Sequence, residues 1–170
     1  MFIWLIFICL AADGYGKTTR DTVTGGVLSV TVHAIIDGDS LVVSDRGKLV
    51  EIRLWGIDSP EYDQPGSEQA KARISGLTAP GRAEIFIKDK DRYGRTVVLL
   101  ECNGINVNEE MVASGHAWVH AYYCKESICK KWTILERGAR NKHLGLWQWE
   151  NPIETRRWKS NRCNPFVSSG

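Results

Sequence analysis

Four short polar clusters interrupt an apolar β-strand pattern in this chain, and their residue types restrict the chemistry that the fold can carry. The clusters are Asp37-Gly38-Asp39-Ser40, Arg53 within Ile52-Arg53-Leu54, Ile57-Asp58-Ser59-Pro60-Glu61 and Asp91-Arg92-Tyr93-Gly94-Arg95. Carboxylates at strand ends can gather a divalent cation. Arginine offers planar, bidentate donors to phosphate oxygens. Together these residue types indicate phosphodiester chemistry.

The apolar residues between the clusters predict strands first and helices later. Period-two alternation and β-branched residues predict five strands, at Val27–Ile36, Leu41–Val43, Leu49–Trp55, Ala83–Lys88 and Thr96–Leu100. Helix-favouring residues and stop signals predict three helices, at Ser67–Ile74 with Ser67 as its N-cap, at Val107–Ser114 and at Ser127–His143. Five strands with late helices predict a small mixed β-barrel. Arg53 points away from the face of Ile52 and Leu54, and Asp58 and Glu61 are expected on a loop.

The length of the chain predicts one folded domain. A chain of 170 residues that is 43% hydrophobic can bury a single core. We expect that domain at residues 27–150, after a flexible lead-in at residues 12–26 and before a carboxyl-terminal extension at residues 151–170. The net charge of +2 does not by itself indicate a polyanion partner. Basic residues nevertheless gather between Lys125 and Lys159, where they would attract a polyanion.

The amino terminus is apolar from Phe2 to Ala12. This stretch is much shorter than the ~20 residues that a helix needs to cross a bilayer, so we interpret residues 1–11 as a secretory signal cleaved after Ala11. The mature protein is then expected to be secreted or periplasmic, without stable membrane association. The alternatives are an uncleaved membrane anchor and, if these residues are no signal, a cytosolic DNA-processing enzyme.

Four cysteines remain if Cys9 leaves with the signal, and an even number in an exported chain favours disulfides. They are Cys102, Cys124, Cys129 and Cys163. Of the three possible pairings, Cys124 with Cys129 is the easiest because it closes a short loop before a predicted helix. That pairing leaves Cys102 with Cys163. A zinc site that combines these thiols with His116, His120 or His143 is the alternative.

The clusters also identify a family. Their order and spacing, with Val107-Asn108 further on, resemble the thermonuclease family of staphylococcal-nuclease-like enzymes, from about Val27 to Trp147. The carboxyl-terminal part resembles an exported, disulfide-bearing branch of that family. Taken singly, each cluster also suits a structural role, such as a hairpin turn at Asp37–Asp39 or a helix start at Asp58–Glu61.

The resemblance implies a role for each site residue. Asp39 and Asp58 would bind a calcium ion through their side chains, and Ser59 through its main-chain carbonyl. Glu61 would hold or deprotonate the attacking water. Arg53 and Arg95 would clamp the phosphate and stabilise the transition state. Tyr93 and Tyr123 would contact the substrate.

The resemblance also implies a fold and an activity. The fold would be an oligonucleotide-binding-type (OB-fold) five-stranded β-barrel with helices packed on it. The activity would be calcium-dependent, non-specific endonucleolytic hydrolysis of DNA and RNA by a monomer, leaving 3′-phosphates. The alternative is a catalytically silent OB-fold module that binds nucleic acid, which requires loss of the metal or phosphate residues. Asp39, Arg53, Asp58, Glu61 and Arg95 are all present.

Overall fold

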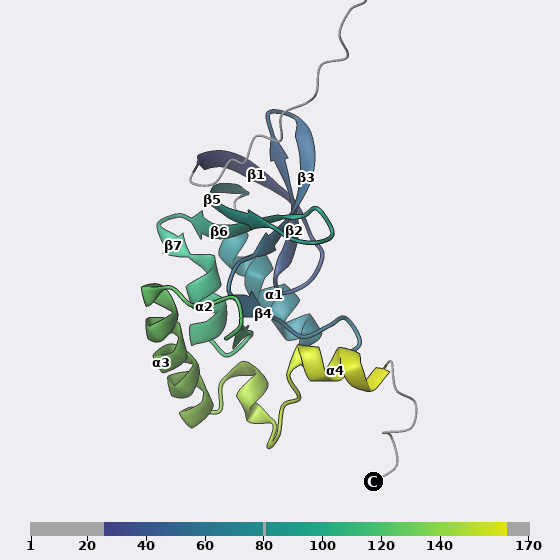
Figure 1. The fold of residues 1–170 in the computed structure, drawn as a ribbon, viewed down its shortest axis with the longest axis vertical. Helices are drawn as coiled ribbons and strands as arrows, with labels where there is room; N and C mark the ends of the chain where they lie inside the picture. The colour runs from purple at the N-terminus through teal and green to yellow at the C-terminus, as the bar shows by residue number, and fades with distance from the viewer. Residues whose placement is uncertain (1–25, 80, 163–170) are drawn as a thin grey trace, which may run out of the picture.

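The computed structural model describes residues 26–79 and 81–162. Figure 1 shows a twisted barrel of strands with helices packed below it and a short helix, α4, near the carboxyl-terminal end. The predicted signal and almost all of the predicted lead-in lie outside the described residues, as does Cys163. In the part of the chain that is described, no helix has the length and apolar character needed to span a membrane.

Five strands form a closed, mixed barrel. They are β1 (Val27–Ile35), β2 (Ser40–Asp45), β3 (Lys48–Leu54), β5 (Arg82–Lys90) and β6 (Thr96–Cys102). The sheet has the order β3-β2-β1-β5-β6-β7, where β7 is Ile105–Asn106, and a parallel pairing of β3 with β6 closes it. The predicted five-stranded barrel is thereby confirmed. Each strand begins and ends within two residues of its predicted bounds.

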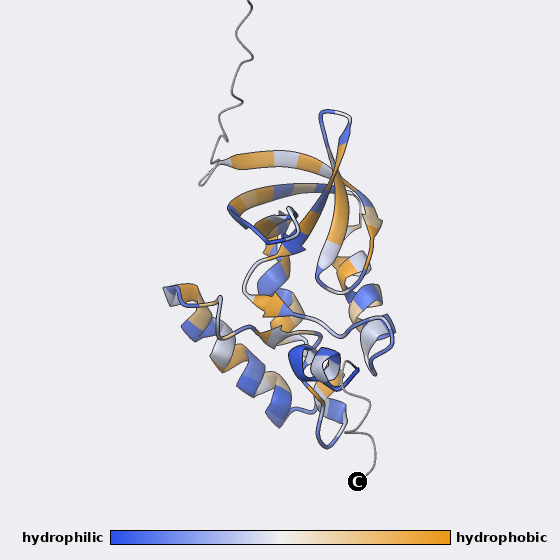
Figure 2. Cartoon of the chain, turned by 45° about the vertical axis from the view of Figure 1, so that its right-hand side comes forward, coloured by the Kyte–Doolittle hydropathy of each residue, from blue (hydrophilic) through white to orange (hydrophobic). Residues whose placement is uncertain are grey.

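The barrel core follows the alternation in the sequence. Leu41 and Val43 in β2, and Ile52 and Leu54 in β3, are two residues apart and are buried. Figure 2 shows hydrophobic and hydrophilic residues alternating along the strands. The most deeply buried barrel residues are Leu41, Val43, Ile52, Leu54, Val98 and Leu100. Because successive side chains in a strand point to opposite faces, burial of Ile52 and Leu54 directs Arg53 to the other side.

The three predicted helices are present. They are α1 (Ser67–Thr78), α2 (Val107–Ala113) and α3 (Ser127–Asn141). The prediction of Ser67 as the N-cap of α1 is wrong, because the N-cap is Gly66 and Ser67 is the first residue of the helix. Gly66 has a left-handed φ of 93°, a conformation that glycine adopts readily. The Ser67 hydroxyl instead donates a hydrogen bond to the carbonyl of Tyr62 at 3.1 Å.

The segment after β3 is more ordered than a loop. Ile57–Asp58 forms a short strand, β4, which pairs with β8 (Trp118–Val119), so that Asp58 lies opposite Trp118. A strand of two residues is too short to show period-two alternation, so it was not predicted from the sequence. The pairing anchors Asp58 to the helical part of the molecule.

The first of the suggested disulfides is confirmed. Cys124 and Cys129 form a disulfide just before and within the first turn of α3, as predicted. These two thiols are therefore not free to bind zinc. Cys102 is a buried thiol whose Sγ donates to the carbonyl of Arg82 at 3.1 Å. Cys163, the partner suggested for it, lies outside the described residues.

The last two helical elements were not predicted from the sequence. Gly145–Gln148 forms a 3-10 helix, η1, and Thr155–Arg162 forms α4 within the predicted carboxyl-terminal extension. α4 is strongly polar, so no apolar periodicity marks it. It lies against the segment that follows β4 (Figure 1), and this contact brings it to the candidate site.

Candidate active site

The site begins at the turn between β1 and β2. The Asp39 amide donates a hydrogen bond to Asp37 Oδ1 at 2.9 Å, which closes the turn. The Asp39 carbonyl accepts a hydrogen bond from the Leu54 amide at 2.8 Å. In the β2–β3 pairing, Ser40 lies directly opposite Arg53. The turn that carries the first carboxylate is therefore held next to the strand that carries the arginine.

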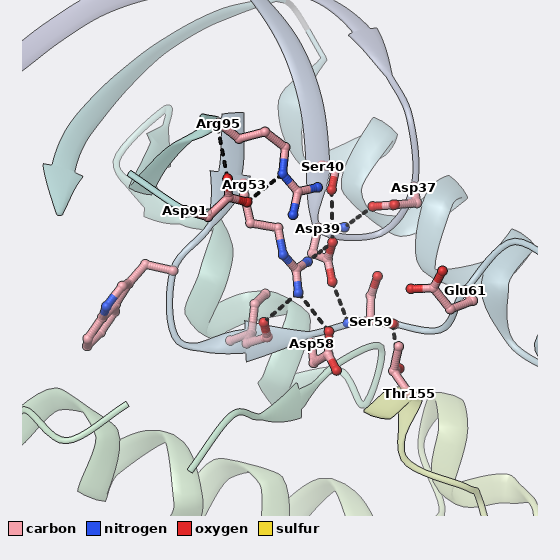
Figure 3. Close-up of polar contacts among 12 residues, drawn as sticks. Asp37, Asp39, Ser40, Arg53, Asp58, Ser59, Glu61, Asp91, Arg95 and Thr155 are labelled. Atoms are coloured by element: carbon pink, nitrogen blue, oxygen red, sulfur yellow. Dashed lines mark hydrogen bonds and ion pairs between the residues drawn. The ribbon is translucent and has the colours of Figure 1, made fainter. Parts of the chain in front are cut away.

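Arg53 joins the two aspartates at the centre of the site (Figure 3). Its Nη1 forms an ion pair with Asp39 Oδ1. Its Nη2 donates to Asp58 Oδ1 at 2.7 Å and to the carbonyl of Ile57 at 3.2 Å. The side chains of Arg53, Asp39 and Asp58 are 16%, 6% and 15% exposed, respectively. One guanidinium group thus bridges two nearly buried carboxylates that come from different parts of the chain.

Burial disfavours the charged forms of Arg53 and Asp58. It lowers the pKa of Arg53, although the carboxylates of Asp58 and Asp37 oppose the shift. It raises the pKa of Asp58 above 3.8, although the charges of Arg53, Lys159 and His120 favour the ionised form. A single arginine shared between Asp39 and Asp58 leaves negative charge that a cation would neutralise.

Ser59 ties the second carboxylate segment to the first. Its amide donates to Asp39 Oδ2 at 2.6 Å, and its carbonyl accepts a hydrogen bond from Thr155 Oγ1 at 2.7 Å. Ser59 is buried, and its Oγ has no hydrogen-bond partner. A buried hydroxyl without a partner is costly, so this oxygen is available to a group that the protein itself does not supply.

Gly38 allows this close approach. A Cβ atom on Gly38 would lie 2.7 Å from the Cβ of Ala70 in α1 and 2.8 Å from both Cβ and Oγ of Ser59. Real Cβ atoms essentially never approach other atoms so closely. The β1–β2 turn, α1 and Ser59 can therefore meet only because residue 38 has no side chain.

Glu61 lies in the same region but is not part of the arginine bridge. Its side chain is about a quarter exposed, and its Oε1 forms an ion pair with Lys159 Nζ of α4 at 2.7 Å. Figure 3 shows its carboxylate on the side of Ser59 away from Arg53. Among the described residues, Lys159 is the only cation paired with Glu61.

Arg95 approaches from the β5–β6 hairpin. Its Nε donates to Asp91 Oδ2 at 2.7 Å, its amide donates to Asp91 Oδ1 at 2.9 Å, and its Nη1 lies 3.5 Å from Glu51 Oε1. Burial alone would raise the pKa of Asp91, but the hydrogen bonds from Arg95 and Tyr93 outweigh it and lower this pKa. Arg95 lies close enough to Arg53 for its charge to contribute to lowering the Arg53 pKa. Asp91 therefore orients a second guanidinium group beside the first.

The two predicted substrate-binding tyrosines differ in their placement. Tyr93 is 70% exposed, and its ring lies 5.7 Å from the Arg95 guanidinium carbon. Tyr123 is 63% exposed and packs against His120, with ring centroids 4.8 Å apart. The structure brings Tyr93 to Arg95, whereas the ring of Tyr123 packs against His120 and Tyr122 instead.

The donor atoms suit a hard cation. Asp39, Asp58 and the Ser59 carbonyl offer only oxygen, which calcium and magnesium prefer. Within the described residues, however, no group of three or more His, Cys, Asp or Glu side chains is placed to hold a metal ion. Arg53 and Thr155 already contact some of these oxygens. A carbonyl oxygen has two lone pairs, so Ser59 retains one. The unpartnered Ser59 Oγ and the excess negative charge also fit a bound cation.

Three residues of the site lie outside the sequence predictions. Asn108 is fully buried; its amide donates to the carbonyls of Trp55 and Val98 at 3.0 and 3.2 Å, and its Oδ1 accepts from the Leu100 amide at 3.0 Å. It therefore ties the residue that follows β3 to the middle of β6. Asn108 appeared in the family motif without a role. No local pattern marks Thr155 or Lys159, because their partners lie far away in the sequence.

Comparison with known proteins places the chain in a family. Residues 51–149 match the family described as "Staphylococcal nuclease homologue". This match begins after Asp39 and ends before α4. The chain is 33% identical over 156 residues to an uncharacterized endonuclease of Haemophilus influenzae, an alignment that covers 91% of this chain and 80% of the relative.

Two further relatives have similar identity. A micrococcal nuclease of Shigella flexneri is 32% identical over 75% of this chain and 78% of that protein. A staphylococcal-like nuclease of Arabidopsis thaliana is 36% identical over 68% of this chain, but only over 35% of the plant protein. The family match, the bacterial relatives and the closed barrel agree: this chain belongs to the staphylococcal nuclease homologue family.

Proposed function

We propose that this chain is a calcium-dependent endonuclease that hydrolyses phosphodiester bonds of DNA and RNA with little sequence preference. The observation that carries the proposal is the bridge of Arg53 between Asp39 and Asp58, with Glu61 and Arg95 beside it. The names of the bacterial relatives, an endonuclease and a micrococcal nuclease, support the reaction class. Among the described residues, the charged side chains of the site are carboxylates and guanidinium groups, which suit a cation and a phosphate rather than base edges, and this supports weak specificity.

Calcium is the cation that we propose for Asp39, Asp58 and the Ser59 carbonyl. It accepts several oxygen ligands in loose geometry and tolerates water and phosphate oxygens among them. When bound, it would polarise the scissile phosphate and neutralise part of its charge.

The chain's own residues supply the remaining chemistry. Glu61 accepts a proton from the attacking water as the water oxygen bonds to phosphorus. The bond from phosphorus to the 5′ oxygen breaks, that oxygen takes up a proton from solvent water, and the phosphate stays on the 3′ oxygen. Arg53 and Arg95 donate to the phosphate oxygens, where negative charge increases in the transition state. Tyr93 and Tyr123 would contact the substrate. Stacking of a base on a tyrosine ring tolerates any base.

We also propose that the protein works outside the cytoplasm as a monomer, without stable membrane association. The Cys124–Cys129 disulfide supports an oxidising compartment. The apolar residues 1–11 support export.

Cleavage assays with controlled metal content test this function. Purified protein should degrade plasmid DNA and single-stranded RNA in calcium and stop when a calcium chelator is added, because the carboxylates alone cannot polarise the phosphate. Gel analysis and end-labelling of the products measure the rate and the predicted 3′-phosphates. Equal degradation with the chelator present contradicts the metal requirement. Tight binding of nucleic acid without cleavage would favour the silent binding module instead.

Gly38→Ala should disable the site without touching any reacting group. The new Cβ would force Ala70 and Ser59 away from the β1–β2 turn and so separate Asp39 from the Ser59 amide. We expect kcat to fall by about 10²-fold, as small misplacements of catalytic groups can cause, and the free energy of unfolding to fall by about 1–3 kcal/mol. Steady-state kinetics and urea unfolding measure the two effects.

Gly76→Ala is the matched control for this prediction. Gly76 lies in α1, and a Cβ there would have no atom within 4 Å. We expect unchanged kcat and a slightly more stable protein, since alanine favours a helix over glycine by about 1 kcal/mol. Equal kinetics for the two variants would show that the close approach at Gly38 does not matter for the site.

A further inference from the structure

α4 lies directly against the segment that carries Glu61. We call residues 59–64 the Glu61 loop. Thr155 Oγ1 donates to the Ser59 carbonyl at 2.7 Å, and Lys159 Nζ pairs with Glu61 Oε1 at 2.7 Å. Two more contacts reach Asp63, from Trp158 Nε1 and Arg162 Nη1, both at 3.1 Å. Figure 3 shows Thr155 pointing from α4 towards Ser59.

These contacts come from one face of the helix. Thr155, Trp158, Lys159 and Arg162 follow the spacing that places side chains on the same side of an α-helix. Thr155 is completely buried, although it belongs to a helix that is otherwise largely exposed. α4 is therefore docked on the loop, and its basic residues meet the carboxylates of Glu61 and Asp63.

The loop has few internal restraints of its own. The Gln64 amide donates to the Glu61 carbonyl at 2.9 Å, and the Glu61 amide donates to Gln64 Oε1 at 3.2 Å. Neither bond fixes the Glu61 carboxylate. Among the described residues, Lys159 is the one that holds this carboxylate, through its ion pair.

We propose that α4 is a positioning element of the active site, in which Thr155 orients the Ser59 carbonyl and Lys159 orients the Glu61 carboxylate. This inference rests on the proposed nuclease function. It adds residues beyond the family match, which ends at residue 149. Partners of this kind, one contact removed from the metal or the reacting water, typically contribute about 10- to 100-fold to activity or metal affinity.

Lys159→Met tests the role of the ion pair, because methionine keeps the length of the side chain and removes the charge. We expect kcat to fall by about 10- to 100-fold with an unchanged KM, because Lys159 contacts the protein rather than the substrate. Lys159→Arg should restore most of kcat, since arginine can also pair with Glu61. Arg156→Met is the matched control: it removes one charge from an exposed position of the same helix and should leave kcat unchanged.

Thr155→Val tests the second contact, because valine has the shape of threonine without the hydroxyl. The Ser59 carbonyl then loses its donor, and we expect calcium affinity, measured by titration calorimetry, to fall by about 10- to 100-fold. Thr155→Ser keeps the hydroxyl and should bind calcium like the wild type. Equal affinity in the valine and serine variants overturns the role of Thr155.

Hydrogen exchange separates this proposal from the nuclease function. In metal-free protein, amides of residues 59–64 should exchange faster in Lys159→Met and Thr155→Val than in the wild type or Arg156→Met. An inactive wild type with this exchange pattern would reject the nuclease function but support docking of α4. An active wild type with unchanged exchange and kcat in Lys159→Met overturns the positioning role. A raised kcat, or a raised KM alone, also overturns it, because Lys159 would then restrain Glu61 or bind substrate.

Discussion

Arg53→Lys is expected to lower kcat by at least about 10²- to 10³-fold, the usual cost of losing one preorganised donor to a transition state. Arg53 contacts Asp39 through one terminal nitrogen and Asp58 through the other. Lysine keeps the positive charge but has a single ammonium group and no planar fork. It cannot span both carboxylates and also present a donor to phosphate. Cleavage of plasmid DNA under saturating calcium and substrate measures the loss.

Two further variants make this result specific. Arg46→Lys is the control, because Arg46 pairs with Asp45 in an exposed turn with its side chain 86% exposed, and its activity should not change. Arg53→Gln removes the charge as well and leaves two nearly buried carboxylates without their partner. We expect that variant to lose about 3–5 kcal/mol of folding free energy, as is typical when one member of a buried pair is removed. Wild-type activity in Arg53→Lys would exclude the bidentate role.

Glu61→Gln is expected to lower kcat by about 10²- to 10⁴-fold, the range in which a general base contributes. Glutamine has almost the same shape but cannot take a proton from water. Binding of nucleic acid in the absence of calcium should stay unchanged, because Glu61 is not placed to bind phosphate. Single-turnover cleavage measures the chemical step, and filter binding measures affinity.

The stability of Glu61→Gln should change little. The lost ion pair with Lys159 joins side chains that are 26% and 56% exposed, and pairs of this kind contribute about 0–1 kcal/mol. Glu68→Gln is the control, since Glu68 is exposed in the first turn of α1 and should keep full activity. If Glu61→Gln cleaved as fast as Glu68→Gln, another group would have to activate the water.

Much of the barrel could be predicted from the sequence because its signals are local. Alternation of more buried and more exposed residues marks β1 and β3, a short apolar run marks β2, and glycine-containing turns separate the three strands. Arg46 and Gly47 both adopt positive φ in the turn between β2 and β3. The same alternation predicted the side of β3 on which Arg53 lies. The short β4 was not predicted because two residues are too few to show a periodic pattern. The Gly66 cap of α1 was not predicted because it depends on one backbone angle, which has no periodic pattern in the sequence.

The sequence by itself determined which strands form, which residues are buried between them and which polar side chains are left at the strand ends, because these depend on neighbours in the chain. Only the tertiary structure decided which of these side chains meet. Thr155 and Ser59 are 96 residues apart, and Asp39 and Asp58 converge on Arg53 only after the barrel closes. Contacts between distant residues depend on how helices and strands pack as a whole, and that packing brought a carboxyl-terminal helix without apolar periodicity to Glu61.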